Sequence, residues 1–349
     1  MVESTVPHYG HSNPGLPEPQ PPVVPFNPGA LDYLAELVLA EEAIKAKWDA
    51  LGGAPGQPQH PLGPEGLRRV PHGYRRDYTG GSIYRRDQGQ PFFLALPTDQ
   101  RYDQLRGPEG YLGFPASDFE TDPEQPDSGV TRFENGAIYF WPDEGAIEMR
   151  EIALRYVGWH CFGETDEPSA SDEIYFTFGV APNLVEHKKT VQTRIWHDTD
   201  AGESRYSESE FMELYRGLPF GAAISITLME HDEGDPNKYR ENVEIAVDKT
   251  ADKIVEKLAA VPVIGTFLAV LGQVVFVLAL PAITDSLNEL LGTEDDLLGT
   301  VGLGLTPKDM MRLTRVGRQD FHGVQAHLES PLIARDGASY KAYFDVEVV

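Results

Sequence analysis

The sequence predicts a mainly β (α+β) protein in which a repeat module precedes an antiparallel β-sandwich. Related stretches recur 55 positions apart in the first half of the chain, as Tyr78 and Phe133 do. Segments that alternate apolar and polar residues, with the period of a half-buried strand, occupy much of the second half. The length of 349 residues corresponds to roughly two domains, and 41% hydrophobic residues are sufficient for packed cores.

The composition excludes several classes of function. Asp and Glu number 55 against 29 Lys and Arg, which gives a formal net charge of −26. Because this charge repels phosphates, nucleic acid is excluded as the main partner. Cys161 is the single cysteine, so neither an intramolecular disulfide nor a cysteine-rich zinc site is possible, and we interpret it as a small core residue.

The chain begins with a proline-rich segment, residues 1–28, which predicts an extended disordered tail. This segment has neither the charged start nor the apolar run of a secretory signal, so the sequence indicates no export route. Apolar residues at helical spacing follow from Leu31 to Trp48, and Gly52 and Gly53 end this predicted helix.

Residues 29–150 are predicted to contain this helix and two copies of a repeat. The copies are KWDALGG with DYTGGSIYRRDQGQ, and QRYDQLRG with RFENGAIYFWPDEGA. Equivalent residues 55 positions apart are Tyr78 and Phe133, Ile83 and Ile138, and Tyr84 and Tyr139.

The predicted turns of the two copies are separated by a different number of positions than the strands. Leu62 of HPLGP is paired with Leu112 of GYLGFP at an offset of 50, which predicts an insertion in the second copy near residues 121–129. Each copy is thus expected to form a helix, a Leu-Gly turn and a strand pair. Its small apolar layer needs the other copy for burial.

The second copy, with YLGFP followed by FENGAIYFWPDEGA, resembles the LGFP repeat family, and the resemblance extends over residues 44–149. The first copy departs from the pattern, with HPLGP in place of LGFP. The family occurs in surface proteins and cell-wall enzymes of actinobacteria. The resemblance therefore implies an extracellular or cell-surface protein whose repeats bind a glycan or protein partner of the cell envelope. Candidates for stacking on sugar rings, with filling of the repeat's own core as the alternative, are Tyr84, Tyr139, Phe140 and Trp141.

Residues 151–349 are predicted to form an antiparallel β-sandwich. Alternating or continuously apolar strand patterns occur at 151–162, 172–182, 189–198, 221–232 and 337–349. A helical insertion is expected at about 240–292.

Acidic residues gather in four of the predicted loops of this sandwich. Carboxylates that converge on one rim repel one another unless a cation neutralises them, and Ca²⁺ binds six to eight oxygens in flexible loops. We therefore predict a calcium site, with loops that are merely solvated as the alternative. The candidate ligands are Asp166, Asp172, Glu173, Asp198, Asp200, Asp232, Asp235, Asp295 and Asp296.

Two of these loops resemble those of C2 domains. ISITLMEHDEGDP followed later by EDDLLGTVGL is similar to the third loop, and ETDEPSASDEIYFTF is similar to the first calcium loop and its strand. The resemblance covers 152–235 and 294–349, and it implies a calcium-binding C2-like sandwich. The ligands that it implies are Asp166, Asp172, Asp232, Asp235 and Asp296.

The insertion contains an apolar stretch, residues 261–283, which is interrupted only by Thr266 and Gln273. We expect a buried helical hairpin, in which this stretch packs against the preceding amphipathic helix and the sandwich. The alternative is a membrane contact, which acidic residues after the stretch and the lack of a basic cluster disfavour.

No catalytic motif assembles in the sequence: GxSxG, HExxH and the phosphate-binding GxxxxGK[ST] are absent. The sequence therefore predicts a non-enzymatic binding protein with an envelope-binding repeat module and a calcium-binding sandwich. One alternative is a hydrolase of cell-envelope polymers that uses Asp198, Asp200 and Asp232 as acid and base. Another is an effector that inserts residues 261–283 into a membrane.

Overall fold

The computed structural model describes residues 28–63, 66–121, 125, 127–165, 172–182, 188–231, 240–241, 243–245, 248 and 297–349. The predicted mainly β architecture is confirmed: antiparallel sheets contain far more of the described residues than helices do. The prediction for residues 1–28 lies outside the described residues, except that helix α1 (Pro28–Ala50) begins at Pro28.

Each repeat forms a four-stranded antiparallel sheet. The first sheet contains β1 (Arg68–Val70), β2 (Gly73–Tyr78), β3 (Gly81–Arg86) and β4 (Pro91–Ala95). The second contains β5 (Glu120–Thr121), β6 (Gly129–Phe133), β7 (Gly136–Trp141) and β8 (Gly145–Met149). Between the sheets the chain forms α2 (Leu96–Gln104) and the 3-10 helix η1 (Gly107–Glu109).

The strand register confirms the repeat. Tyr78 pairs with Gly81 across β2 and β3, and Phe133 pairs with Gly136 across β6 and β7, at the predicted separation of 55 positions. The insertion predicted near residues 121–129 is also found, because residues 71–72 connect β1 to β2 whereas residues 122–128 connect β5 to β6.

The pairing of Leu62 with Leu112 is wrong. Pro58 occupies the place of Leu112: its carbonyl accepts a hydrogen bond from the Gly80 backbone N–H at 3.0 Å, as the Leu112 carbonyl does from Asn135 at 3.1 Å. The turn requires a left-handed backbone, which Gln59 adopts at φ 61° in the first copy and Gly113 at φ 71° in the second. The Leu-Gly dipeptide was therefore a misleading marker of this turn.

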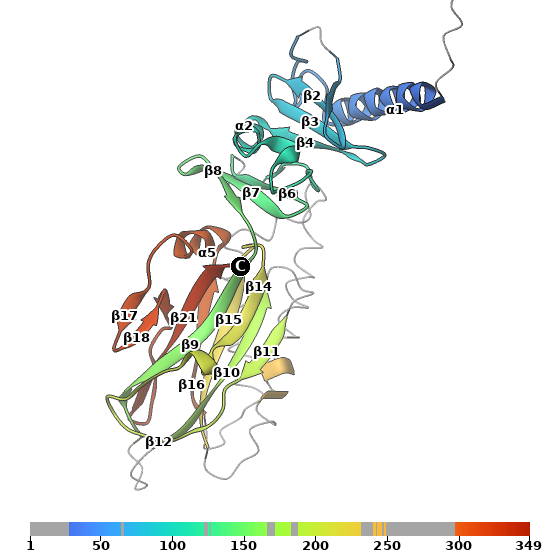
Figure 1. The fold of residues 1–349 in the computed structure, drawn as a ribbon. Coiled ribbons are helices and arrows are strands. Elements are labelled where there is room, and N and C mark those ends of the chain that lie inside the picture. The colour runs from blue at the N-terminus through green and yellow to red at the C-terminus, as the bar shows by residue number, and fades with distance from the viewer. Residues whose placement is uncertain are drawn as a thin grey trace, which may run out of the picture.

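Helices and sheets alternate along the repeat module. The Trp48 ring of α1 stacks on Tyr78 of the first sheet, with centroids 6.4 Å apart, and the Tyr102 ring of α2 packs on Phe133 of the second, with centroids 4.7 Å apart. Both sheets contribute to the apolar core around α2. Figure 1 shows α2 between the sheet of β2, β3 and β4 and the sheet of β6, β7 and β8. Each copy thus completes the core of the other, as predicted.

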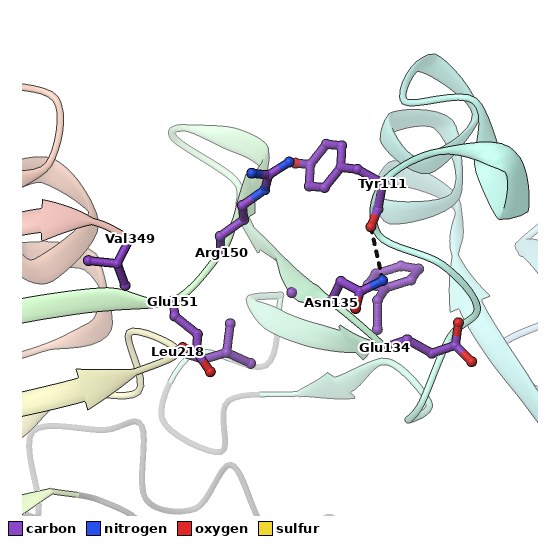
Figure 2. Close-up of a pocket in the computed structure, with 9 residues that line it drawn as sticks. Tyr111, Glu134, Asn135, Arg150, Glu151, Leu218 and Val349 are labelled. Atoms are coloured by element: carbon purple, nitrogen blue, oxygen red, sulfur yellow. Dashed lines mark hydrogen bonds between the residues drawn. The ribbon is translucent and has the colours of Figure 1, made fainter.

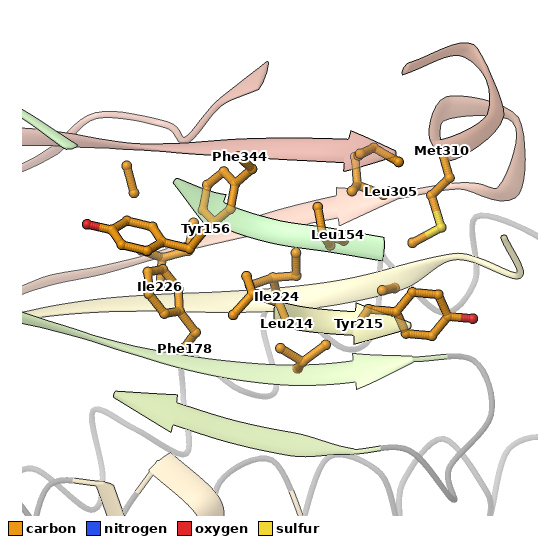
Figure 3. Packing of buried hydrophobic residues seen from close by; sticks show 14 of the residues in the cluster. Leu154, Tyr156, Phe178, Leu214, Tyr215, Ile224, Ile226, Leu305, Met310 and Phe344 are labelled. Atoms are coloured by element: carbon orange, nitrogen blue, oxygen red, sulfur yellow. The ribbon is translucent and has the colours of Figure 1, made fainter. Parts of the chain in front are cut away.

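The sandwich consists of two antiparallel sheets with a shared apolar core (Figure 3). One has the strand order β11-β10-β15-β16, with β12 also paired to β10; the other has the order β13-β9-β21-β19, with β14 paired to β9 and β20 to β21. A separate hairpin contains β17 and β18.

The elements of this half follow in chain order. They are β9 (Ile152–Gly163), β10 (Asp172–Pro182), β11 (Lys189–Gln192), β12 (Trp196–Thr199), β13 (Ser204–Tyr206), the 3-10 helix η3 (Glu208–Glu210), β14 (Met212–Gly217), β15 (Ala222–Glu230), β16 (Leu297–Leu305), α5 (Pro307–Leu313), β17 (Gln319–Phe321), β18 (Val324–Ala326), β19 (Leu328–Glu329), β20 (Ile333–Arg335) and β21 (Ala338–Val348).

The second repeat packs directly on the sandwich. Tyr139 lies 6.1 Å from Phe220 between ring centroids, and one apolar core continues from the second repeat sheet into both sandwich sheets. At the edge of this junction, Lys308 and Arg312 of α5 form ion pairs with Asp143 and Glu144, respectively. The sandwich therefore closes the end of the repeat stack.

The apolar stretch 261–283 lies outside the described residues, as does most of the insertion predicted at 240–292. Residues 240–241, 243–245 and 248 are helical, and Val243 is buried. Within the described part of the chain, no helix is both long and apolar enough to span a bilayer.

Candidate functional site

A cleft of about 450 Å³ lies where the second repeat meets the sandwich (Figure 2). The repeat contributes most of the lining and the sandwich contributes the opposite side. The lining residues are Tyr111, Phe133, Glu134, Asn135, Gly136, Arg150, Glu151, Leu218 and Val349.

The repeat wall of the cleft is formed by the YLGFP loop and the FENG turn, which are bonded to each other. The Asn135 side-chain amide donates to the Tyr111 carbonyl at 3.1 Å. Glu134 Oε2 accepts a hydrogen bond from the Phe114 backbone N–H at 3.1 Å. These bonds fix the loop that presents Tyr111, a residue that is 38% exposed.

Gly113 is required in this loop for two reasons. Its φ of 71° lies in the left-handed region, and a Cβ there would come within 2.3 Å of the Glu134 carboxylate. A side chain at this position would displace Glu134 from the Phe114 N–H. The glycine thus allows the loop and the turn to approach closely.

The charged groups of the cleft differ in their pairing. Arg86 forms an ion pair with Glu134, which neutralises that carboxylate. The Arg150 guanidinium lies 4.4 Å from the centroid of the Tyr111 ring, and the two side chains point toward one another in Figure 2. Arg150 is exposed, and its side chain forms no ion pair or hydrogen bond within the described residues. Partial burial raises the pKa of Tyr111, so its hydroxyl remains protonated at neutral pH.

The structure does not expose most of the aromatic residues proposed to stack on sugars. Tyr84 and Tyr139 are 1% and 0% exposed, and Trp141 is largely buried against Tyr139, with ring centroids 5.5 Å apart. Phe140, on the other side of β7, is half-buried. The interpretation of Tyr84, Tyr139 and Trp141 as sugar-binding residues is corrected: they fill the cores between layers.

Of the predicted calcium ligands, Asp172 has a structural role in this conformation. Its carboxylate accepts hydrogen bonds from the Thr165 backbone N–H at 3.0 Å, the Thr165 hydroxyl at 2.7 Å and the Tyr340 hydroxyl at 2.6 Å. Because it is 1% exposed and bonded at both oxygens, it is not available to a cation without rearrangement. It ties the end of β9 to β10 and β21.

The remaining predicted ligands divide into two groups. Glu173 pairs with His197 at 3.0 Å, and Asp198 and Asp200 are exposed near the end of β12. Outside the described residues lie Asp166, Asp232, Asp235, Asp295 and Asp296. Among the described residues, no group of three or more His, Cys, Asp or Glu side chains is arranged to hold a metal ion.

The strand ends that carry these acidic segments nevertheless meet at one end of the sandwich. Asp172 at the start of β10 pairs in register with Thr199 at the end of β12. Ile174 pairs with Glu230 at the end of β15, and Met229 pairs with Leu297 at the start of β16.

Cys161 is fully buried, and burial raises the pKa of its thiol. A buried, protonated thiol is a poor nucleophile, so the side chain is suited to its predicted role as a small core residue.

Tyr111 and Asn135 lie within the repeat motifs YLGFP and FENG, but they are not among the site residues predicted from the sequence. Their position beside the turn glycines was the available signal. Arg150 and Leu218 had no comparable signal, because their contribution depends on how the repeat meets the sandwich.

Comparison with models of protein families gave no match for this chain, and a search of curated proteins gave none either.

Proposed function

We propose that the protein is a non-enzymatic binding protein whose repeat stack binds a glycan of the cell envelope in the cleft beside Tyr111. One observation carries this proposal: YLGFP and FENG, the stretches on which the resemblance to LGFP repeats rests, form the wall of the cleft. The motif residues therefore shape a surface as well as a core.

The chemistry of the lining suits a sugar. A partly exposed tyrosine ring offers an apolar face, while the Asn135 amide and the Glu151 carboxylate offer hydrogen-bonding groups around it. The volume of about 450 Å³ is within the range of small-ligand sites. An open, polar cleft of this kind favours a segment of a polymer over an enclosed small molecule.

The first repeat does not reproduce this cleft. The hydrogen bonds of the turn place Gln57 at the position of Tyr111. The strand register places Ala95 at the position of Arg150, and α2 begins directly after Ala95. We therefore expect one glycan site per chain, with the first repeat and α1 acting as support for the second.

A second proposed function is calcium binding by the sandwich, as in C2-like domains. The convergence of the β10, β12, β15 and β16 ends at one rim supports it, because the acidic segments adjoin those ends. The proposed ligands are Glu173, Asp198 and Asp200, together with Asp166, Asp232, Asp235, Asp295 and Asp296. Asp172 would not bind the cation but would hold the strand ends of the rim in place through its hydrogen bonds to Thr165 and Tyr340. The hydrolase and membrane-effector alternatives depend on Asp232 and on residues 261–283, which lie outside the described residues.

Sedimentation with purified actinobacterial cell wall tests the glycan proposal. The full chain should pellet with the wall, and Tyr111→Ala should weaken the affinity for the wall about fivefold or more, since a stacking aromatic contributes on the order of 1 kcal/mol or more. Gln57→Ala, at the equivalent position of the first repeat, is the matched control and should pellet normally. Equal pelleting of both variants would contradict the proposed site.

A further inference from the structure

We propose that the glycan in the cleft is anionic, and that Arg150 binds its oxyanion, a sugar carboxylate or a phosphodiester. This inference rests on the proposed function, since it specifies the ligand class of the same cleft. It concerns the one charged side chain of the repeat wall that the described residues leave unneutralised.

The pairing of arginines in the repeat module makes Arg150 an exception. Between residues 66 and 149, each arginine forms an ion pair with a carboxylate: Arg68, Arg69, Arg75, Arg76, Arg85, Arg86, Arg101, Arg106 and Arg132. In a chain with 55 acidic residues, carboxylates are plentiful. Arg150 nevertheless has no ion pair within the described residues, although Glu148 and Glu151 are close in sequence; Glu148 pairs with Arg101 instead.

The position of Arg150 is suited to an oxyanion. The Tyr111 ring occupies one face of the guanidinium at 4.4 Å, while the N–H donors lie in the plane of the group and are free to bond. A planar guanidinium binds carboxylate or phosphate through two parallel hydrogen bonds. Because Tyr111 restricts the side chain before the ligand arrives, less conformational entropy is lost on binding.

The two carboxylates that line the cleft do not pair with Arg150. Glu134 is engaged by Arg86 and by the Phe114 N–H. Glu151 lies on the sandwich side of the cleft, and Figure 2 shows its side chain directed away from Arg150. An oxyanion that approaches the edge formed by Tyr111 and Arg150 would therefore meet an arginine whose positive charge is not neutralised by a paired carboxylate.

Because of the negative charge of the whole protein, a preference for an anionic over a neutral ligand would indicate a local cation. With a net charge of −26, the protein repels anions at long range, so general attraction cannot produce a preference for an acidic ligand. A preference for an acid over a neutral analogue of the same size must come from a local cation. Raising the salt concentration should weaken the long-range repulsion more than the short-range pair.

The test uses two matched ligand pairs and the full chain. Trigalacturonate is compared with its methyl ester, and the methyl phosphodiester of glucose at O6 with glucose, by calorimetric titration. The wild-type protein should bind the anionic member of at least one pair about ten- to hundredfold more tightly, as expected for a charge-assisted hydrogen bond. The pair that shows the preference identifies the oxyanion.

Variants assign the preference to Arg150. Arg150→Gln should bind the anionic and neutral members equally, while its melting temperature stays that of the wild type because the side chain is exposed. Arg315→Gln is the matched control, since Arg315 is also exposed and without an ion pair in the described residues but does not line the cleft. Equal binding of acid and neutral analogue by the wild type, or a preference that survives Arg150→Gln, would overturn the inference.

The outcome separates this inference from the proposed function. If wall pelleting depends on Tyr111 but neither ligand pair shows a preference for the anion, glycan binding stands and the anionic ligand is wrong. If wall pelleting does not depend on Tyr111, the cleft is not the glycan site and both fail.

Discussion

The carboxyl group of Asp99 makes the stability of the protein depend on pH, and the structure predicts the pH range of this dependence. The carboxylate lies on α2 against the first repeat sheet and is 5% exposed. It accepts hydrogen bonds from Arg75 at 3.1 Å, Ser82 at 2.6 Å and Tyr84 at 2.9 Å. Burial outweighs these bonds and raises the pKa of Asp99 from 3.8 to about 6.

The raised pKa means that the folded state binds a proton that the unfolded state has released between about pH 4 and 6. Folding is therefore most favoured by this group below pH 4, and that contribution is lost as the pH rises through about 6. A shift of roughly two units corresponds to about 3 kcal/mol, with each unit equivalent to about 1.4 kcal/mol. Asp99→Asn removes the titration and keeps an acceptor for Arg75 and Ser82.

Urea unfolding of the wild type and Asp99→Asn at several pH values measures this contribution. The two proteins should have similar stability near pH 4, and the variant should become more stable by up to about 3 kcal/mol near pH 8. A difference between wild type and Asp99→Asn that is flat with pH, or that reverses sign, would refute the reasoning.

Three further predictions concern the core, the rim and the insertion. Tyr139→Ala should destabilise the protein by about 3–5 kcal/mol in urea unfolding, because it leaves a cavity between the second repeat and the sandwich, whereas Phe140→Ala should cost much less. Millimolar Ca²⁺ should raise the melting temperature, and at 100 times Kd it should add about 2.7 kcal/mol to the free energy of unfolding. Mg²⁺ should raise it less, and a melting temperature that does not respond to Ca²⁺ would contradict the calcium proposal. The protein should cause no leakage of neutral liposomes at pH 7 or pH 5, and leakage at pH 5 that Val275→Asp abolishes would contradict the buried-hairpin prediction.

The sequence was most informative where local pattern and packing agree. Strand alternation predicted the sandwich, and the 55-residue recurrence predicted a strand pair in each copy, which the structure has as β2 with β3 and β6 with β7 in the same register. The prediction that Leu62 is equivalent to Leu112 was wrong because the turn is determined by a left-handed backbone conformation. In the first copy Gln59 adopts this conformation, so no glycine marks the turn.

The candidate site was less accessible to sequence reasoning. Aromatic residues suggested sugar stacking at Tyr84 and Tyr139, yet an aromatic side chain on a small sheet is also the largest available filler for the next layer. The cleft arises only where Arg150 and Tyr111 of the repeat meet Leu218 of the sandwich. Likewise, the bonds that occupy Asp172 come from Thr165 and from Tyr340, which is 168 positions away in the chain.

Hydrogen exchange of the full chain, with and without solubilised cell-wall glycan, tests the central claim most directly. If the repeat stack binds glycan in the cleft, backbone amides of residues 110–115, 133–136 and 150–151 should exchange more slowly in the presence of the glycan. The equivalent turn of the first repeat, residues 56–61, should be unchanged. Protection confined to α1 or to the rim near Asp198, with none at the cleft, would contradict the account.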